Sequence, residues 1–186
     1  MAALSFIIGA FVALMAVWFV RRRIGFLGQR PEHYAEGGPT FDLTRHLSGE
    51  MFCDGVIYGP SGRVVSRFAA DFNIVWNGAK AIMSEHFRYD SGETQDRAWH
   101  LELREDGRFT ANADDLIGEG SGVQSGPTVC LSYRIKLPPD AGGHVLDVVD
   151  WMYLTPDGTI INRSQFRKYG FKVAELVATM RRKEPA

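Results

Sequence analysis

Four side chains have the types that a binding site for an amphipathic molecule requires: Arg97, Trp99, Trp151 and Arg163. Each arginine shares a predicted strand face with large apolar residues, where an unpaired charge is costly. An arginine that contacts an anionic head group, beside tryptophans that contact an apolar tail, would explain the combination. The same pattern also fits arginines at strand ends or on an outer face, so both interpretations stay open.

Three acidic residues are the candidates for acid–base chemistry: Asp150, Asp115 and Glu85. Asp115 follows Asp114 directly, and adjacent residues of a strand point to opposite faces, so this pair is poorly placed to share a proton. No catalytic triad, nucleophile elbow or cofactor motif accompanies the three acids. The sequence therefore assigns no catalytic residue and predicts no cofactor. An enzyme that modifies a lipid or an isoprenoid stays an alternative to a binding protein.

The remaining reactive residue types do not form a recognisable motif. The five histidines lack the HxH or HxxxH spacing of a metal site, and Cys53 and Cys130 form no CxxC pair, so no metal site is predicted. The two cysteines are expected to be small buried hydrophobic residues, with a disulfide between them as the open alternative. The glycine-rich stretch 118–122 lacks the lysine of a phosphate loop and is predicted to be a turn or a bulged strand edge.

The composition is that of one globular domain with a small appendage. The chain has 186 residues, of which 45% are hydrophobic and 23% are charged, so disorder is not expected. Its net charge of -1 gives no support for a nucleic-acid partner, which requires a basic surface. Twenty glycines and twelve phenylalanines fit a β protein with many tight turns.

A succession of strands is predicted after Thr40, preceded by a short helical turn over residues 42–47 with Asp42 as its cap. Turn signals such as Asn77-Gly78 and Asp106-Gly107 separate the strands. The nine predicted strands are Phe52–Tyr58, Arg63–Asn77, Lys80–Tyr89, Thr94–Arg104, Arg108–Asn112, Thr128–Leu137, His144–Leu154, Thr159–Tyr169 and Phe171–Met180. Their connections are too short for a crossover helix, so neighbouring strands are expected to be antiparallel.

Nine antiparallel strands in succession form a meander, and closure of a long meander removes its exposed edges. We therefore predict a mainly β protein, an antiparallel meander that closes into a lipocalin-like β-barrel, preceded by one transmembrane α-helix. A β-sandwich is the alternative. Barrels of about eight strands can hold one small ligand.

Alternation within the strands predicts which side chains face the interior. Phe68, Phe72 and Trp76 share one face of the longest strand, and Arg67 and Asp71 share the other. The same counting puts the four candidate ligand-binding side chains on mixed faces. Arg97 lies with Trp99 and Gln95, Trp151 with Val149, Tyr153 and Asp147, and Arg163 with Ile161, Gln165 and Arg167. If the barrel binds a ligand, these four are expected to line one interior site; otherwise the arginines are expected at strand ends or on the outer face.

The N-terminal segment has the pattern of a membrane anchor. Residues 2–20 carry no charge and would form a helix roughly 28 Å long at about 1.5 Å per residue, close to a hydrocarbon core of about 30 Å. Trp18 suits the membrane interface, and three arginines at 21–23 end the run. The predicted organisation is a transmembrane anchor at 1–23, a linker at 24–39 and a barrel domain at 40–186. The lipid bilayer is the partner expected for residues 2–20.

The arginines that follow the apolar run also predict an orientation. By the positive-inside rule, the N-terminus lies outside and the β domain lies in the cytoplasm. The expected location is the inner (cytoplasmic) membrane, crossed once. The ligand's identity and the oligomeric state are left open.

Four blocks, in order along the chain, carry a family resemblance. They are Phe41-Asp42-Leu43 with Leu47-Ser48-Gly49; residues 113–118 continuing to Gly120 and Gly122; residues 150–154; and Asn162-Arg163-Ser164 followed by Lys168-Tyr169-Gly170. With Arg97-Ala98-Trp99 they span nearly all of the chain after Thr40. In these blocks the sequence resembles the bacterial domain-of-unknown-function family 3833, which is uncharacterised and lipocalin-like.

The resemblance implies no activity and no catalytic residue. Many members look like lipoproteins with a cysteine at the end of the hydrophobic segment, which implies a periplasmic domain, in contrast to the orientation that the arginines predict here. Relatives encoded beside lipid-modifying enzymes imply an acyl lipid as ligand. Three functions stay open: a membrane-anchored carrier of a lipid or other amphipathic anion, a lipid- or isoprenoid-modifying enzyme, and a ligand-free interaction domain.

Overall fold

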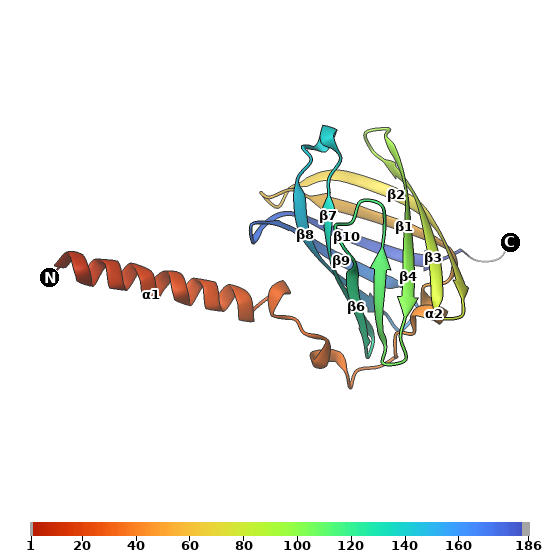
Figure 1. The fold of residues 1–186 in the computed structure, drawn as a ribbon, viewed down its shortest axis with the longest axis horizontal. Coiled ribbons are helices and arrows are strands. Elements are labelled where there is room, and N and C mark those ends of the chain that lie inside the picture. Colours follow the sequence, from red (N-terminus) through yellow and green to blue (C-terminus); the bar gives the residue numbers. More distant parts are fainter. Residues whose placement is uncertain (1, 184–186) are drawn as a thin grey trace.

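The computed structural model describes residues 2–183, and its main body is a closed barrel of ten antiparallel strands (Figure 1). The strands are β1 (Gly49–Tyr58), β2 (Val64–Asn77), β3 (Lys80–Tyr89), β4 (Thr94–Leu103), β5 (Arg108–Asn112), β6 (Gly120–Ser125), β7 (Thr128–Lys136), β8 (Val145–Leu154), β9 (Ile160–Lys168) and β10 (Phe171–Arg182). Each strand pairs with the next, and β1 pairs with β10 to close the barrel. The predicted meander and barrel are therefore confirmed, and the sandwich is excluded. Met1 and residues 184–186 of the predicted anchor and barrel domains lie outside the described residues.

The tenth strand, β6, is the one that the sequence pattern did not predict as a strand. Gly120 and Gly122 lie within it, and a side chain at Gly122 would overlap the ring of Phe109 on the neighbouring strand β5. The glycines therefore make room for an interior aromatic ring. The sequence left a turn or a bulged strand edge open for residues 118–122, and residues 120–122 lie in β6, since glycine signals close approach as well as turns.

One end of the barrel is closed by the segment that precedes β1. The short helix α2 (Leu43–His46) is capped by the Asp42 carboxylate, which accepts a hydrogen bond from the Thr44 backbone N–H at 2.9 Å. Leu43 is fully buried, and the carbonyl of Leu47 accepts a hydrogen bond from the Trp76 indole N–H at 2.9 Å. The predicted cap and helical turn are confirmed, and together they seal this end of the interior.

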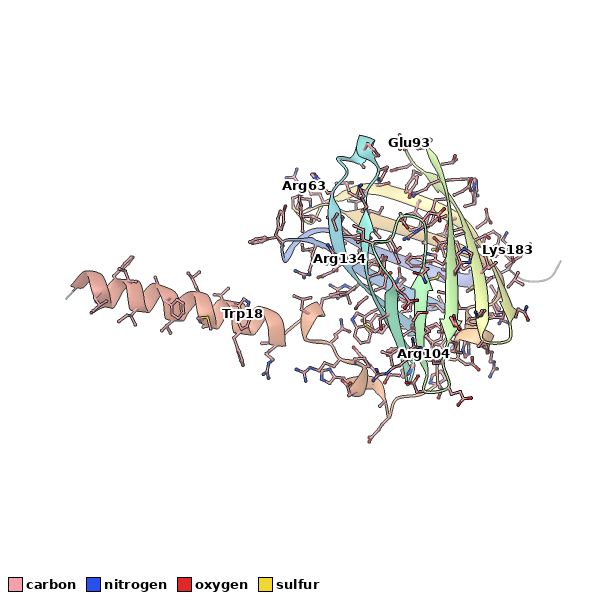
Figure 2. The ribbon with its side chains drawn as sticks, in the orientation of Figure 1. Trp18, Arg63, Glu93, Arg104, Arg134 and Lys183 are labelled. Atoms are coloured by element: carbon pink, nitrogen blue, oxygen red, sulfur yellow. The ribbon has the colours of Figure 1, made fainter. Side chains whose placement is uncertain are left out.

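The N-terminal helix α1 (Ala2–Arg23) extends away from the barrel (Figure 1). Its apolar side chains project outward along its length, and Trp18 is exposed (Figure 2). Within the described part of the chain, no helix combines the length and the apolar character needed to cross a bilayer, so the transmembrane helix predicted for residues 1–23 is not supported.

Three short 3-10 helices complete the described secondary structure. Two of them, η1 (Phe26–Gly28) and η2 (Pro31–Tyr34), lie in the predicted linker, and η3 (Pro139–Ala141) lies between β7 and β8. Cys53 points into the barrel from β1, and Cys130 lies on the outer face of β7. Both cysteines are free thiols, and burial raises the pKa of each to about 12.

Candidate functional site

A cavity of about 130 Å³ lies inside the barrel. Most of its wall is aromatic or aliphatic, with Phe68, Phe72, Phe87, Leu101 and Met152 among the lining residues. Polar groups enter it from five strands: Glu85 from β3, Arg97 from β4, Tyr133 from β7, Asp150 from β8, and Asn162 and Ser164 from β9. An apolar cavity with a few fixed polar groups is typical of small-molecule sites.

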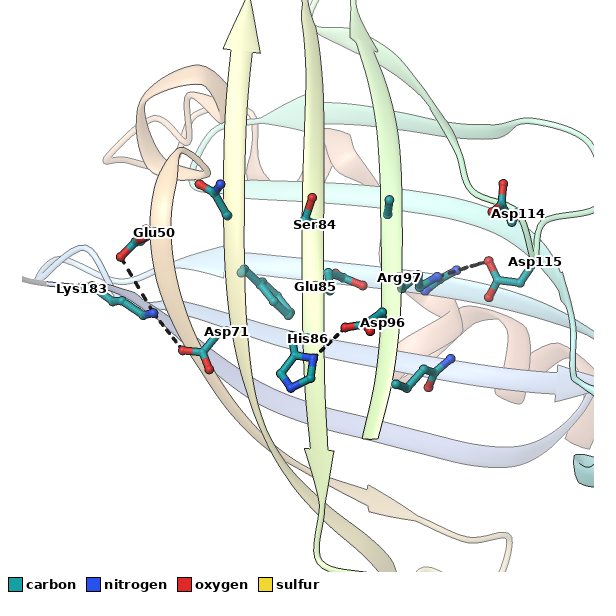
Figure 3. A pocket seen from close by; sticks show the side chains of 14 residues that line it. Glu50, Asp71, Ser84, Glu85, His86, Asp96, Arg97, Asp114, Asp115 and Lys183 are labelled. Atoms are coloured by element: carbon teal, nitrogen blue, oxygen red, sulfur yellow. Dashed lines mark hydrogen bonds and ion pairs between the residues drawn. The ribbon is translucent and has the colours of Figure 1, made fainter. Parts of the chain in front are cut away.

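Arg97 is the cation of this site. Its guanidinium lies 4.0 Å from the centre of the Trp99 ring, and its Nε and Nη2 donate to Asp115 Oδ1 at 3.2 and 2.9 Å (Figure 3). The Arg97 side chain is 18% exposed and that of Asp115 is 35% exposed. Stacking on an indole and pairing with a carboxylate both favour the charged guanidinium. Arg97 is therefore held in place by contacts on two sides.

Asp115 reaches Arg97 from a loop, residues 113–119, that lies beside the part of β4 that β5 does not pair with. The pairing of β4 with β5 covers His100 to Leu103, so the first half of β4 lies beyond that ladder. Residues 113–119 fill this position and attach to β7, where the Lys136 N–H donates to the Asp115 carbonyl at 2.8 Å. The structure therefore gives Asp115 a partner, Arg97, instead of its neighbour in sequence, Asp114.

Glu85 is the most unusual group of the site. It lies opposite Arg97 in the β3–β4 ladder, is 7% exposed, and its Oε2 atom has no hydrogen-bond partner among the described residues. Burial raises the pKa of Glu85 to about 8, against the opposing effects of the Arg97 charge and a hydrogen bond from Trp99. The carboxyl is therefore largely protonated at neutral pH.

Asp150, in contrast, is surrounded by donors. The Tyr133 hydroxyl donates to Asp150 Oδ2 at 2.9 Å, the Asn162 amide donates to Oδ1 at 3.4 Å, and the Ser164 hydroxyl also donates to Oδ1. Burial raises the pKa of the Asp150 carboxyl above its usual range, and the hydrogen bonds from Tyr133 and Asn162 oppose that rise. Asp150 thus needs no further partner.

An open groove of about 660 Å³ runs along the outside of β2, β3 and β4 as far as the 113–119 loop (Figure 3). Phe72, Glu85 and Arg97 line both this groove and the interior cavity, so the two spaces meet at these side chains. Ion pairs cross the groove: Lys183 with Asp71 at 2.9 Å and His86 with Asp96 at 2.6 Å.

The four side chains predicted to bind a ligand lie in two places. Arg97 and Trp99 are inside the barrel, whereas Trp151 and Arg163 are on its outer face. In β8 the interior side chains are Leu146, Val148, Asp150, Met152 and Leu154, the opposite parity from the one predicted. The prediction that all four line one interior site was therefore wrong.

The physical reason is that a second layer covers the outer face of β8 and β9. The Tyr34 ring centre lies 5.4 Å from that of Trp151, and the Gln29 side-chain oxygen accepts from the hydroxyls of Tyr34 and Tyr153, each at 2.6 Å. Arg163 lies over the ring of Phe26, 5.1 Å from its centre. The segment predicted as a linker is thus packed against the barrel wall. Both faces of β8 are apolar, so alternation could not tell them apart.

Sequence reasoning missed Tyr133, Asn162 and Ser164. Tyr133 alternates with Val129, Leu131 and Ile135 on the buried face of β7, and this alternation is a signal that could have found it. Asn162 and Ser164 flank Arg163 on β9, and they were missed because Arg163 was predicted to face the interior, which put its two neighbours on the opposite face. The three acids considered for catalysis, Glu85, Asp115 and Asp150, do gather around Arg97.

The chain belongs to the family described as protein of unknown function (DUF3833), whose family model matches residues 22–182. A search of the curated proteins finds no match. Among solved structures, the S-type phycobiliprotein lyase CPES from Guillardia theta is similar, with a TM-score of 0.59, 10% identity, and coverage of 85% of this chain and 99% of that chain. Rv2717c from M. tuberculosis has a TM-score of 0.54 and 17% identity, covering 80% of this chain and 100% of its own. At these identities the similarity shows a shared fold.

Proposed function

We propose that this member of the family binds a small amphipathic molecule inside its barrel, with the polar end of the molecule at Glu85 and Arg97. One observation carries the proposal: an apolar interior cavity contains a buried carboxyl oxygen that has no partner among the described residues. Native proteins rarely leave such an atom unsatisfied, and each exception calls for an explanation. A ligand that completes the hydrogen bonding of Glu85 is that explanation.

The size of the cavity limits the ligand. A space of about 130 Å³ is below the roughly 300–1,000 Å³ of common ligand pockets. It is close to an engineered protein cavity of about 150 Å³ that binds benzene. A ring-sized compound therefore fits the interior as it stands, and a complete acyl lipid requires the aromatic wall to move.

The role first expected for Arg97, contact with an anionic head group, is weakened by its partner. Asp115 already neutralises the guanidinium, so an anion must displace this carboxylate or share its donors. Arg97 still supplies hydrogen-bond donors that position a polar end. The solved barrels support the fold, and at 10% identity the phycobiliprotein lyase leaves the ligand to be argued from the residues of this cavity.

A ligand-free interaction domain is the second candidate, and the small volume of the cavity is the observation that favours it. Native mass spectrometry of the full-length chain in detergent, followed by solvent extraction, separates the two functions. We expect a bound small molecule at one per chain, or a thermal shift with ring-sized amphipathic compounds. A clean apo mass without any such shift would favour the interaction domain.

A further inference from the structure

We infer that the polar end of the ligand is a cation, such as an ammonium group, bound at Glu85 where the interior cavity meets the outer groove. This inference rests on the proposed function and adds the charge class of the ligand. It departs from the anionic head group expected from the sequence, because the structure surrounds Arg97 with carboxyl groups.

The first argument is the balance of charge inside the barrel. Three carboxyl groups, those of Glu85, Asp115 and Asp150, gather around one guanidinium. Arg97 pairs with Asp115, and neutral donors satisfy Asp150, so Glu85 is left without a hydrogen-bond partner for Oε2. Among the described residues that line the cavity, Arg97 is the only cationic side chain. An ammonium group at Oε2 supplies the missing hydrogen-bond partner, and its charge stabilises Glu85 as a carboxylate where burial alone keeps the carboxyl protonated.

The second argument is the charge of the groove outside. Six carboxyl groups line it, from Glu50, Asp71, Glu85, Asp96, Asp114 and Asp115, against the two permanent cations Arg97 and Lys183 and the imidazole of His86. Lys183 pairs with Asp71 and Glu50 at the end away from the loop. At the other end Arg97 is matched by Asp115, which leaves Asp114 and Asp96 without a permanent cation, so this end is acidic. A cleft of one sign concentrates ligands of the opposite sign.

A cation at Glu85 also makes binding dependent on pH. The charged and titratable groups that act on Glu85 or respond to it are Arg97, Asp115, Tyr133, Asp150, Cys53 and Tyr89. Because burial raises the pKa of Glu85 to about 8, an ammonium ligand must displace a proton below that pH. Affinity is therefore expected to rise about tenfold from pH 6 to pH 7 and to level off above pH 8.

Three ring-sized probes of nearly equal shape test the charge class: benzylamine, benzyl alcohol and benzoate. Isothermal titration calorimetry on the full-length chain at pH 8 is expected to give the tightest binding for benzylamine, about tenfold tighter than benzyl alcohol, with benzoate weakest. In Glu85→Gln the advantage of benzylamine over benzyl alcohol should disappear. Glu102→Gln is the matched control, since Glu102 is an exposed acid that pairs with Lys80 at 3.5 Å.

The outcomes separate the two proposals. If none of the probes binds, the interior site itself is refuted, and the charge class with it. If benzyl alcohol or benzoate binds as tightly as benzylamine, the interior site stands and the cation is refuted. Should Glu85→Gln fail to fold, Asp115→Asn provides a second variant, which should weaken benzylamine and strengthen benzoate because Arg97 loses its partner carboxylate. Equal binding of all probes by that variant would also refute the cation.

Discussion

Glu85→Gln is expected to change how the stability of the barrel depends on pH. Burial raises the folded-state pKa of Glu85 to about 8, from 4.5 for the unperturbed side chain. Between these values the folded protein holds a proton that the unfolded chain has released. Stability that is present below pH 4.5 is therefore lost as the pH rises through 8.

The expected change in unfolding free energy follows from the pKa shift of Glu85. Each pH unit between the two pKa values removes about 1.4 kcal/mol, so the wild type loses up to about 5 kcal/mol between pH 4.5 and pH 8 relative to the variant. Glutamine has nearly the shape of the protonated acid and cannot ionise. The free energy of unfolding in urea, measured for both proteins at unit steps from pH 5 to pH 8, gives the difference directly.

Titrating groups that do not interact with Glu85 behave alike in the two proteins, so they cancel in that difference. Glu102→Gln, on the exposed face of β4, is the control: its difference in unfolding free energy from the wild type should vary much less with pH. A difference between wild type and Glu85→Gln that stays flat from pH 5 to pH 8 would refute the reasoning. It would mean that the Glu85 carboxylate is ionised, with a partner or water in place, throughout that range.

Two further predictions concern the parts that hold the site. Gly122→Val should destabilise the barrel by about 1–3 kcal/mol, because the new side chain overlaps Phe109. In urea unfolding, adding Phe109→Ala to this variant should recover part of the lost stability. If the two substitutions instead destabilise the barrel additively, the contact between residue 122 and Phe109 is contradicted. Tyr34→Ala should release residues 24–39 from Trp151 and Tyr153 on the barrel wall. Limited proteolysis should then cut faster within residues 24–39 while the barrel stays intact. An unchanged cleavage rate would show that Tyr34 does not hold this segment.

The strands and their turns were predictable because their signals are local. Asn-Gly and Asp-Gly pairs mark hairpins through backbone conformations that other residues rarely adopt, and nine of the predicted strands overlap strands of the barrel. The faces of β2 were also predictable, because one face meets the core and the other meets water. The faces of β8 were not, because residues 24–39 cover its outer side. Alternation reports burial, and it fails where both faces are buried.

The candidate site likewise combines residues placed by local signals with residues placed by the closure of the barrel. The β3–β4 hairpin places Glu85 opposite Arg97 by its own register, which pairs Arg88 with Thr94 beside the turn. This neighbour relation could have been counted from the sequence once the turn was located. Asp115 and Asp150 join the pair only because the barrel closes and the 113–119 loop takes the place of a strand beside β4. The excess of carboxyl groups over guanidinium is thus a property of closure, and it is closure that changes the expected ligand from an anion to a cation.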